Sequence, residues 1–122
     1  MNTAPEKPLP PAKGLRAGAL LVSGVINLAG ALLILFAMQG TASDDRVAAA
    51  WALVQFISGV WAGVLGANSP FLHGLVAGLP ALLLGLAFRN QLPPQYVAVS
   101  WFLAPSAALL AAALMRYLRR RG

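Results

Sequence analysis

The chain has 122 residues, of which 59% are hydrophobic and 10% are charged, and its mean hydropathy is +0.74. Soluble domains carry about 25% charged residues, so this composition excludes an ordinary soluble domain. Nine basic and three acidic residues give a net charge of +6, but most of the basic residues lie near the chain ends, which disfavours a nucleic-acid partner. The absence of cysteine excludes disulfides, iron–sulfur clusters and thiolate metal sites.

Residues 1–16 are predicted to form a proline-rich cytoplasmic arm. Four prolines between residues 5 and 11 favour an extended, polyproline-like conformation. The arm is either a disordered tail or a segment that docks on a neighbouring subunit. The apolar run that follows has 22 residues, which exceeds the 7 to 15 of a cleaved signal peptide, so we interpret it as a membrane span.

Four apolar stretches are each long enough to cross a bilayer as a helix. They cover residues 17–38, 47–67, 71–88 and 96–115, and none contains Asp, Glu, Lys or Arg. A helix needs about 20 apolar residues to cross a hydrocarbon core of about 30 Å. We therefore predict an all-α integral membrane protein, with a four-helix transmembrane domain over residues 17–115.

Turn and proline residues divide these stretches. In the turn between the second and third spans, Asn68 is predicted to close one helix, Ser69 to cap the next and Pro70 to occupy its first position. So short a link predicts an antiparallel hairpin. Pro80 and Pro105 lie inside the third and fourth spans, where each is expected to kink its helix.

The distribution of basic residues predicts the orientation, because Lys and Arg are retained on the cytoplasmic side. Only Arg46 and Arg89 lie in the loops expected outside. An even number of spans places both termini on one face, so we predict a multi-pass protein of the bacterial inner membrane with both termini cytoplasmic. Seven basic residues lie before the first span or after the fourth: Lys7, Lys13, Arg16, Arg116, Arg119, Arg120 and Arg121.

The basic tail, residues 116–122, is predicted to anchor the topology and to attract anionic lipid. Each arginine near an anionic membrane surface contributes about 1 kcal/mol of attraction. The arginines concerned are Arg116, Arg119, Arg120 and Arg121. The bilayer is therefore an expected partner, and bound lipid is expected.

Small residues at intervals of four are expected to let the helices approach closely. The second span contains Gly59-x-x-x-Gly63 and the third contains Gly74-x-x-x-Gly78, and these two strips are predicted to face each other. The alternative is contact with another subunit, either a different membrane protein or a second copy. Trp51 is predicted to lie at the headgroup boundary, and Trp61 to pack between helices.

Few polar side chains lie inside the spans. Asn27 and Gln55 are predicted to form interhelical hydrogen bonds, with a pore lining as the alternative. His73 has no second His, Asp or Glu nearby, which makes it a poor metal or haem ligand. It is interpreted as a neutral interfacial histidine near a helix start. The alternatives are pH sensing and contact with a cofactor held by a partner.

The motifs of common catalytic chemistry are missing from the sequence. One histidine and no cysteine leave only a serine with His73 as a nucleophilic pair, and no G-x-S-x-G surrounds any serine. Phosphate-binding glycine motifs are also missing. We therefore expect no enzymatic activity and no cofactor bound by this chain alone.

The two halves of the chain match weakly at a shift of 50 residues. Trp51-x-Leu53 falls on Trp101-x-Leu103, and Val47-Ala48 falls on Val97-Ala98. The match indicates either a tandem pair of two-helix hairpins or chance similarity in a sequence rich in alanine and leucine.

The middle hairpin reads Gly59-x-x-x-Gly63-x-x-Gly66, followed after the turn by His73-Gly74-Leu75-x-x-Gly78-Leu79. This pattern resembles a family of small uncharacterised bacterial membrane proteins with four spans, in which a glycine-rich second span precedes an H-G-L-x-x-G-L third span. The resemblance implies the four-span fold and assigns no activity to these residues.

The function expected from the sequence is that of a non-catalytic accessory or structural subunit in a larger energy-transducing or transport complex of the inner membrane. Spans without ionisable acid–base pairs and with many glycines motivate this expectation. An oligomeric channel or small-solute permeability factor is the alternative, and a holin-like pore former is the third.

Overall fold

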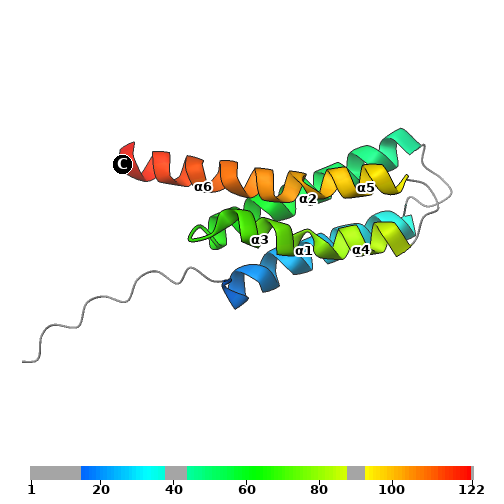
Figure 1. Ribbon diagram of the computed structural model, residues 1–122, viewed down its shortest axis with the longest axis horizontal. Helices are drawn as coiled ribbons and strands as arrows, with labels where there is room; N and C mark the ends of the chain where they lie inside the picture. Colours follow the sequence, from blue (N-terminus) through cyan, green and yellow to red (C-terminus); the bar gives the residue numbers. More distant parts are fainter. Residues whose placement is uncertain (1–14, 38–43, 88–92, 122) are drawn as a thin grey trace, which may run out of the picture.

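A computed structural model describes residues 15–37, 44–87 and 93–121, and every regular element in these ranges is an α-helix (Figure 1). The four apolar rods lie side by side along one common direction (Figure 1). The helices are α1 (Ala17–Ala37), α2 (Asp44–Leu65), α3 (Pro70–Ala77), α4 (Leu79–Ala87), α5 (Pro94–Trp101) and α6 (Leu103–Arg121).

The number of spans agrees with the sequence prediction. Four helical rods are long and apolar enough to cross a membrane, namely α1, α2, α3 with α4, and α5 with α6. The all-α prediction with four candidate spans is therefore confirmed. The helical ends differ by a few residues from those expected, and the largest difference is at the C-terminus, where α6 remains helical to Arg121.

The third and fourth rods are each broken once, close to a proline. The break between α3 and α4 falls at Gly78, two residues before Pro80, and the break between α5 and α6 falls at Phe102, three residues before Pro105. Proline has no N–H, and its ring clashes with the carbonyl four residues earlier, so the chain cannot continue a regular helix there. At the second break the amide of Phe102 donates to Val99 O at 3.1 Å. Both helices are therefore interrupted close to the prolines that were predicted to disrupt them.

The closest backbone approach joins α2 to α6, which corrects the glycine pairing expected from the sequence. Gly59 lies directly against the backbone of Ala104, and Gly63 lies against that of Ala108. The glycine strip of α2 therefore faces the alanine strip of α6 rather than the glycines of α3. The spacing of small residues identifies a surface that can approach closely, but it does not identify the partner surface.

The glycines of the third rod contact the fourth rod as well. Gly74 packs against the backbone of Ala104 and Pro105, and Gly78 lies against the side chains of Gln55 and Trp101. Because α6 receives glycines from both α2 and α3, it occupies the junction of three helices.

The two tryptophans of α2 differ from the prediction in their burial. Trp51 is 2% exposed and belongs to the core with Ile34 and Val47, whereas Trp61 is 45% exposed. Successive helical residues are 100° apart, so Trp61 points almost directly away from Gly59, which faces α6. The predicted packing of Trp61 between helices is wrong, because the prediction considered depth in the membrane and not the rotation of α2.

The indole N–H groups of Trp51 and Trp101 differ in hydrogen bonding, so replacing each tryptophan by phenylalanine should change stability by different amounts. Trp101 Nε1 donates to Leu75 O at 2.8 Å, whereas the buried Trp51 Nε1 has no acceptor. Trp101→Phe is therefore expected to lower the free energy of unfolding more than Trp51→Phe, by about 1 to 2 kcal/mol, because only the first change breaks a hydrogen bond. Denaturation of both variants in the same detergent measures the difference. Equal losses would show that the Trp101 bond contributes nothing.

Candidate functional site: a buried polar network

Three polar side chains meet in the middle of the bundle, and none of them has any exposed surface. Asn27 lies on α1, and Gln55 and Ser58 lie on the inward face of α2. The two N–H bonds of Asn27 Nδ2 are directed at Gln55 Oε1, at 3.1 Å, and at Ser58 Oγ, at 2.8 Å. The predicted interhelical partnership of Asn27 and Gln55 is present in the structure.

The backbone at the break between α3 and α4 also belongs to the network. Ala81 is in the first turn of α4, where helical N–H groups lack a partner within the helix. Its amide donates to Asn27 Oδ1 at 2.7 Å. Gln55 Nε2 donates to Gly78 O at 3.3 Å. The polar side chains of α1 and α2 therefore bond to the backbone at the break. Asn27 accepts from the Ala81 amide, and Gln55 is a second donor to Gly78 O, which also accepts from the Leu82 amide at 3.2 Å.

The network is closed in the sense that each amide nitrogen and oxygen atom of Asn27 and Gln55 has at least one hydrogen-bond partner within it. Ser58 Oγ accepts from Asn27 and lies 2.8 Å from Val54 O, to which it donates. All members are neutral, and carboxamides and a hydroxyl do not exchange protons near neutral pH. The network can fix the relative positions of three rods, and each interhelical bond contributes about 0.6 to 2 kcal/mol in a membrane.

His73 forms a second buried contact, at the end of the bundle where α1 and α3 begin. Its side chain is completely buried, Nε2 accepts from the Arg16 amide at 2.8 Å, and Nδ1 lies 2.8 Å from Ser69 O. An N–H donor at Nε2 and a carbonyl at Nδ1 together assign the neutral tautomer with its proton on Nδ1. The ring lies directly against Gly66 in the turn after α2.

His73 therefore joins the start of α1 to the turn between α2 and α3. Ser69 makes no side-chain capping bond, and the predicted cap is corrected: its carbonyl receives both the His73 amide, at 3.1 Å, and the His73 ring. Pro70 occupies the start of α3 as expected. His73 is buried inside the helix junction, and it lies near a helix start as predicted.

Replacing His73 by phenylalanine is expected to release the Arg16 amide. The planar ring can still stack on Gly66, but both hydrogen bonds are lost, which costs about 1 to 2 kcal/mol. Hydrogen–deuterium exchange of the peptide that covers residues 15–20 should become faster. Leu72→Phe, at the exposed neighbouring position, is the control and should leave this exchange unchanged. Unchanged exchange in His73→Phe would contradict the assigned contact.

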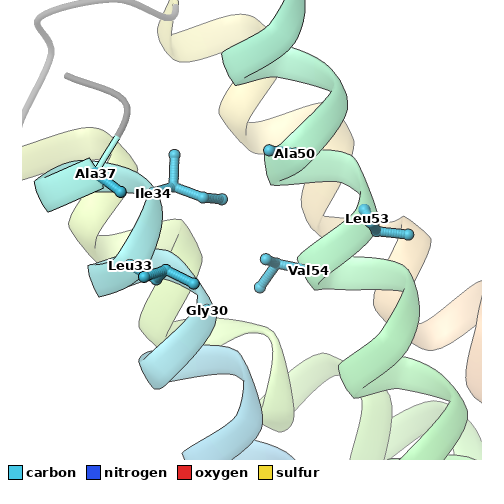
Figure 2. A pocket seen from close by; sticks show the side chains of 7 residues that line it. All are labelled: Gly30, Leu33, Ile34, Ala37, Ala50, Leu53 and Val54. Carbon is cyan, nitrogen blue, oxygen red and sulfur yellow. The ribbon is translucent and has the colours of Figure 1, made fainter. Parts of the chain in front are cut away.

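A groove of about 320 Å³ lies between α1 and α2, and only nonpolar residues line it (Figure 2). Leu33 of α1 and Val54 of α2 point toward each other across it (Figure 2). Its other lining residues are Gly30, Ile34, Ala37, Ala50 and Leu53. Such a lining offers no group for acid–base chemistry or for holding a metal ion.

The remaining predicted site residues lie apart from the network. Arg116, Arg119 and Arg120 are exposed near the end of α6, and the side chain of Arg121 lies outside the described residues. Within the ranges that the structure describes, no three His, Cys, Asp or Glu side chains come together as a metal site.

Sequence reasoning missed the backbone members of the network and Ser58 as the second acceptor for Asn27. Pro80 was the available signal, because a proline inside a span leaves helical backbone groups that need other partners.

The burial pattern repeats at the same 50-residue shift as the sequence match. Both members of seven pairs are buried: Ser23 and His73, Asn27 and Ala77, Ala31 and Ala81, Val47 and Val97, Gln55 and Pro105, Ser58 and Ala108, and Ala62 and Ala112. The corresponding helices therefore present corresponding faces to the bundle, which favours a tandem pair of hairpins. Within this pattern most of the buried polar side chains lie in the first half, whereas both helix-breaking prolines lie in the second half.

These observations define the class of protein: an all-α bundle with four helices apolar enough to cross a membrane, closed inside by a neutral hydrogen-bond network. No family model matches the chain, and no curated protein or solved structure matches it.

Proposed function

We propose that the chain is a non-catalytic accessory or structural subunit of a larger energy-transducing or transport complex in a bacterial inner membrane. The observation that carries this proposal is the closed network around Asn27. Its groups are neutral and fully buried, and they bond to one another and to the backbone of α3 and α4. Such a network holds helices together and transfers neither protons nor charge.

The His73 contact supports the same function. Both ring nitrogen atoms form hydrogen bonds with backbone groups of this chain, so the ring connects helix ends. The resemblance of the middle hairpin to small bacterial four-span proteins is part of this proposal. In such a subunit, the reacting groups and any cofactor belong to the partner chains.

Photo-crosslinking in native membranes tests the proposal. A photoreactive residue is placed singly at exposed apolar positions on different rods: Leu33, Leu53, Leu83 and Leu110. We expect a discrete protein adduct at the positions of one face and only lipid adducts at the others. The buried Ala62 position is the control for background labelling. Lipid adducts alone at every exposed position, together with purification of the isolated chain at every concentration, would contradict a subunit role.

A pore is the competing proposal, and the positions of its expected lining residues disfavour it. Asn27 and Gln55 have no exposed surface and bond to each other inside one chain. Liposomes that contain the purified protein are therefore expected to remain tight to ions and small neutral solutes. A flux that changes in Asn27→Ala would support the channel, and lysis on a schedule after induction would support a holin-like pore former.

A further inference from the structure

The last part of α6 leaves the bundle as a separate helical segment. Ala104, Ala108 and Ala112 are buried along one face of α6, but every described side chain from Arg116 to Arg120 is exposed. Figure 1 shows this end of α6 running past the starts of α1 and α3. We use the term α6 extension for residues 114–121.

Helix length explains why α6 leaves the bundle. The fourth rod, Pro94–Arg120, has 27 residues, whereas α1 has 21. At a rise of 1.5 Å per residue, the fourth rod is about 40 Å long and α1 is about 32 Å long. The hydrocarbon core is about 30 Å thick, with a headgroup region on either side. A bundle that fills the core therefore places the α6 extension in the headgroup region.

The α6 extension has two chemically different sides. Leu114, Tyr117 and Leu118 continue the exposed apolar side that Leu110 begins. At 100° per residue, Arg116 and Arg120 fall on the other side of the helix. This pattern is typical of a helix at a membrane surface, because the apolar side chains reach the acyl chains while the arginines meet the headgroups.

Charge is unbalanced at this end of the bundle. The three described arginines of the α6 extension are joined at the same end by Arg16, which precedes α1 and is also exposed. The only acidic residues in the described ranges are Asp44 and Asp45, and both lie at the opposite end, where α2 begins (Figure 1). The arginine charges therefore have no carboxylate of the described chain near them, and phosphate is the anion that the headgroup region supplies.

We propose that the α6 extension binds the phosphate headgroups of anionic lipids through Arg116, Arg119 and Arg120. Guanidinium groups form paired hydrogen bonds with phosphate oxygens, and Leu114 and Leu118 hold the helix at the depth of the headgroups. The site is specific for this end of the bundle and is independent of any partner protein.

Native mass spectrometry of the purified chain tests this binding site in micelles that contain equal amounts of phosphatidylglycerol and phosphatidylcholine. The wild-type chain should retain phosphatidylglycerol at least tenfold more often. Each arginine replaced by glutamine should lower this preference about twofold, as expected for an exposed ion pair. The triple variant Arg116→Gln, Arg119→Gln, Arg120→Gln should therefore retain both lipids equally, and the corresponding triple lysine variant should keep a preference for phosphatidylglycerol.

Arg46→Gln provides the matched control, because it removes one exposed positive charge at the opposite end. It should leave the lipid preference within twofold of the wild type. All the arginine side chains exchanged in the α6 extension are exposed, so the triple variants should keep the far-ultraviolet circular dichroism of the wild type. Equal retention of the two lipids by the wild type, or an unchanged preference in the triple glutamine variant, would overturn the proposal.

Discussion

Gly63→Leu is expected to separate α2 from α6 and to lower the free energy of unfolding by about 3 kcal/mol or more. A side chain at Gly63 would meet the backbone of Ala108, which cannot rotate away as a flexible side chain could. Helix association in lipid depends on such close approach, so the added volume removes contacts along the whole interface. Titration of the detergent-solubilised protein with a denaturing detergent, followed by circular dichroism, measures the loss.

Gly18→Leu is the control for this experiment. A Cβ atom at Gly18 has nothing within 4 Å, so the same substitution adds an exposed side chain to α1. It should leave the transition unchanged or raise its midpoint slightly, because leucine favours the helix more than glycine does. If Gly63→Leu and Gly18→Leu unfolded at the same denaturant concentration, the contact between α2 and α6 would not have the importance assigned to it.

Asn27→Leu is expected to cost about 2 to 3 kcal/mol of unfolding free energy. The two residues have similar lengths, but the change leaves the Ala81 amide and Gln55 Oε1 buried without their partner. Ser23→Ala is the matched control on the same buried face of α1, because Ser23 Oγ donates only to Ala19 O of its own helix, at 2.6 Å. That variant should change stability by less than about 0.5 kcal/mol.

A double-mutant cycle separates the network from general packing. Pro80→Ala restores an N–H to the third rod and allows a continuous helix, in which the Ala81 amide can donate within its own rod. The cost of Asn27→Leu should therefore be about 1 kcal/mol smaller in the Pro80→Ala background. Strict additivity of the two changes would show that Asn27 does not compensate for the helix break.

Local features of the sequence were sufficient to predict the spans and the breaks. Span length and the absence of charge decide whether a segment is stable in hydrocarbon, and both can be read within one segment. The effects of Pro80 and Pro105 are equally local, because a proline disrupts the hydrogen bonds of its own helix.

The pairing of surfaces could not be predicted in the same way, because it depends on how each helix is rotated about its axis. The α2 glycines could have faced either neighbouring rod, and the structure places them on α6. The rotation of α2 did have a signal in the sequence. Trp51, Gln55 and Ser58 recur at intervals of four and three residues, which places them on one helical face with the polar groups that need burial.

The candidate site was predictable only in part for the same reason. Asn27 and Gln55 were recognisable as polar side chains inside spans. Their backbone partners, Gly78 O and the Ala81 amide, have no side-chain signature. Burial of His73 against Gly66 likewise depends on the turn between α2 and α3 and on where α1 begins.

Site-directed labelling of single cysteines tests the arrangement of the spans most directly, because the natural chain has none. Asp45→Cys places a thiol at the start of α2, and Arg120→Cys places one in the α6 extension at the other end of the bundle. In intact cells, a membrane-impermeant maleimide should label the thiol at position 45, and it should reach position 120 only after the membrane is opened. Labelling of position 120 in intact cells, or equal labelling of both positions, would contradict four membrane-crossing rods with cytoplasmic termini.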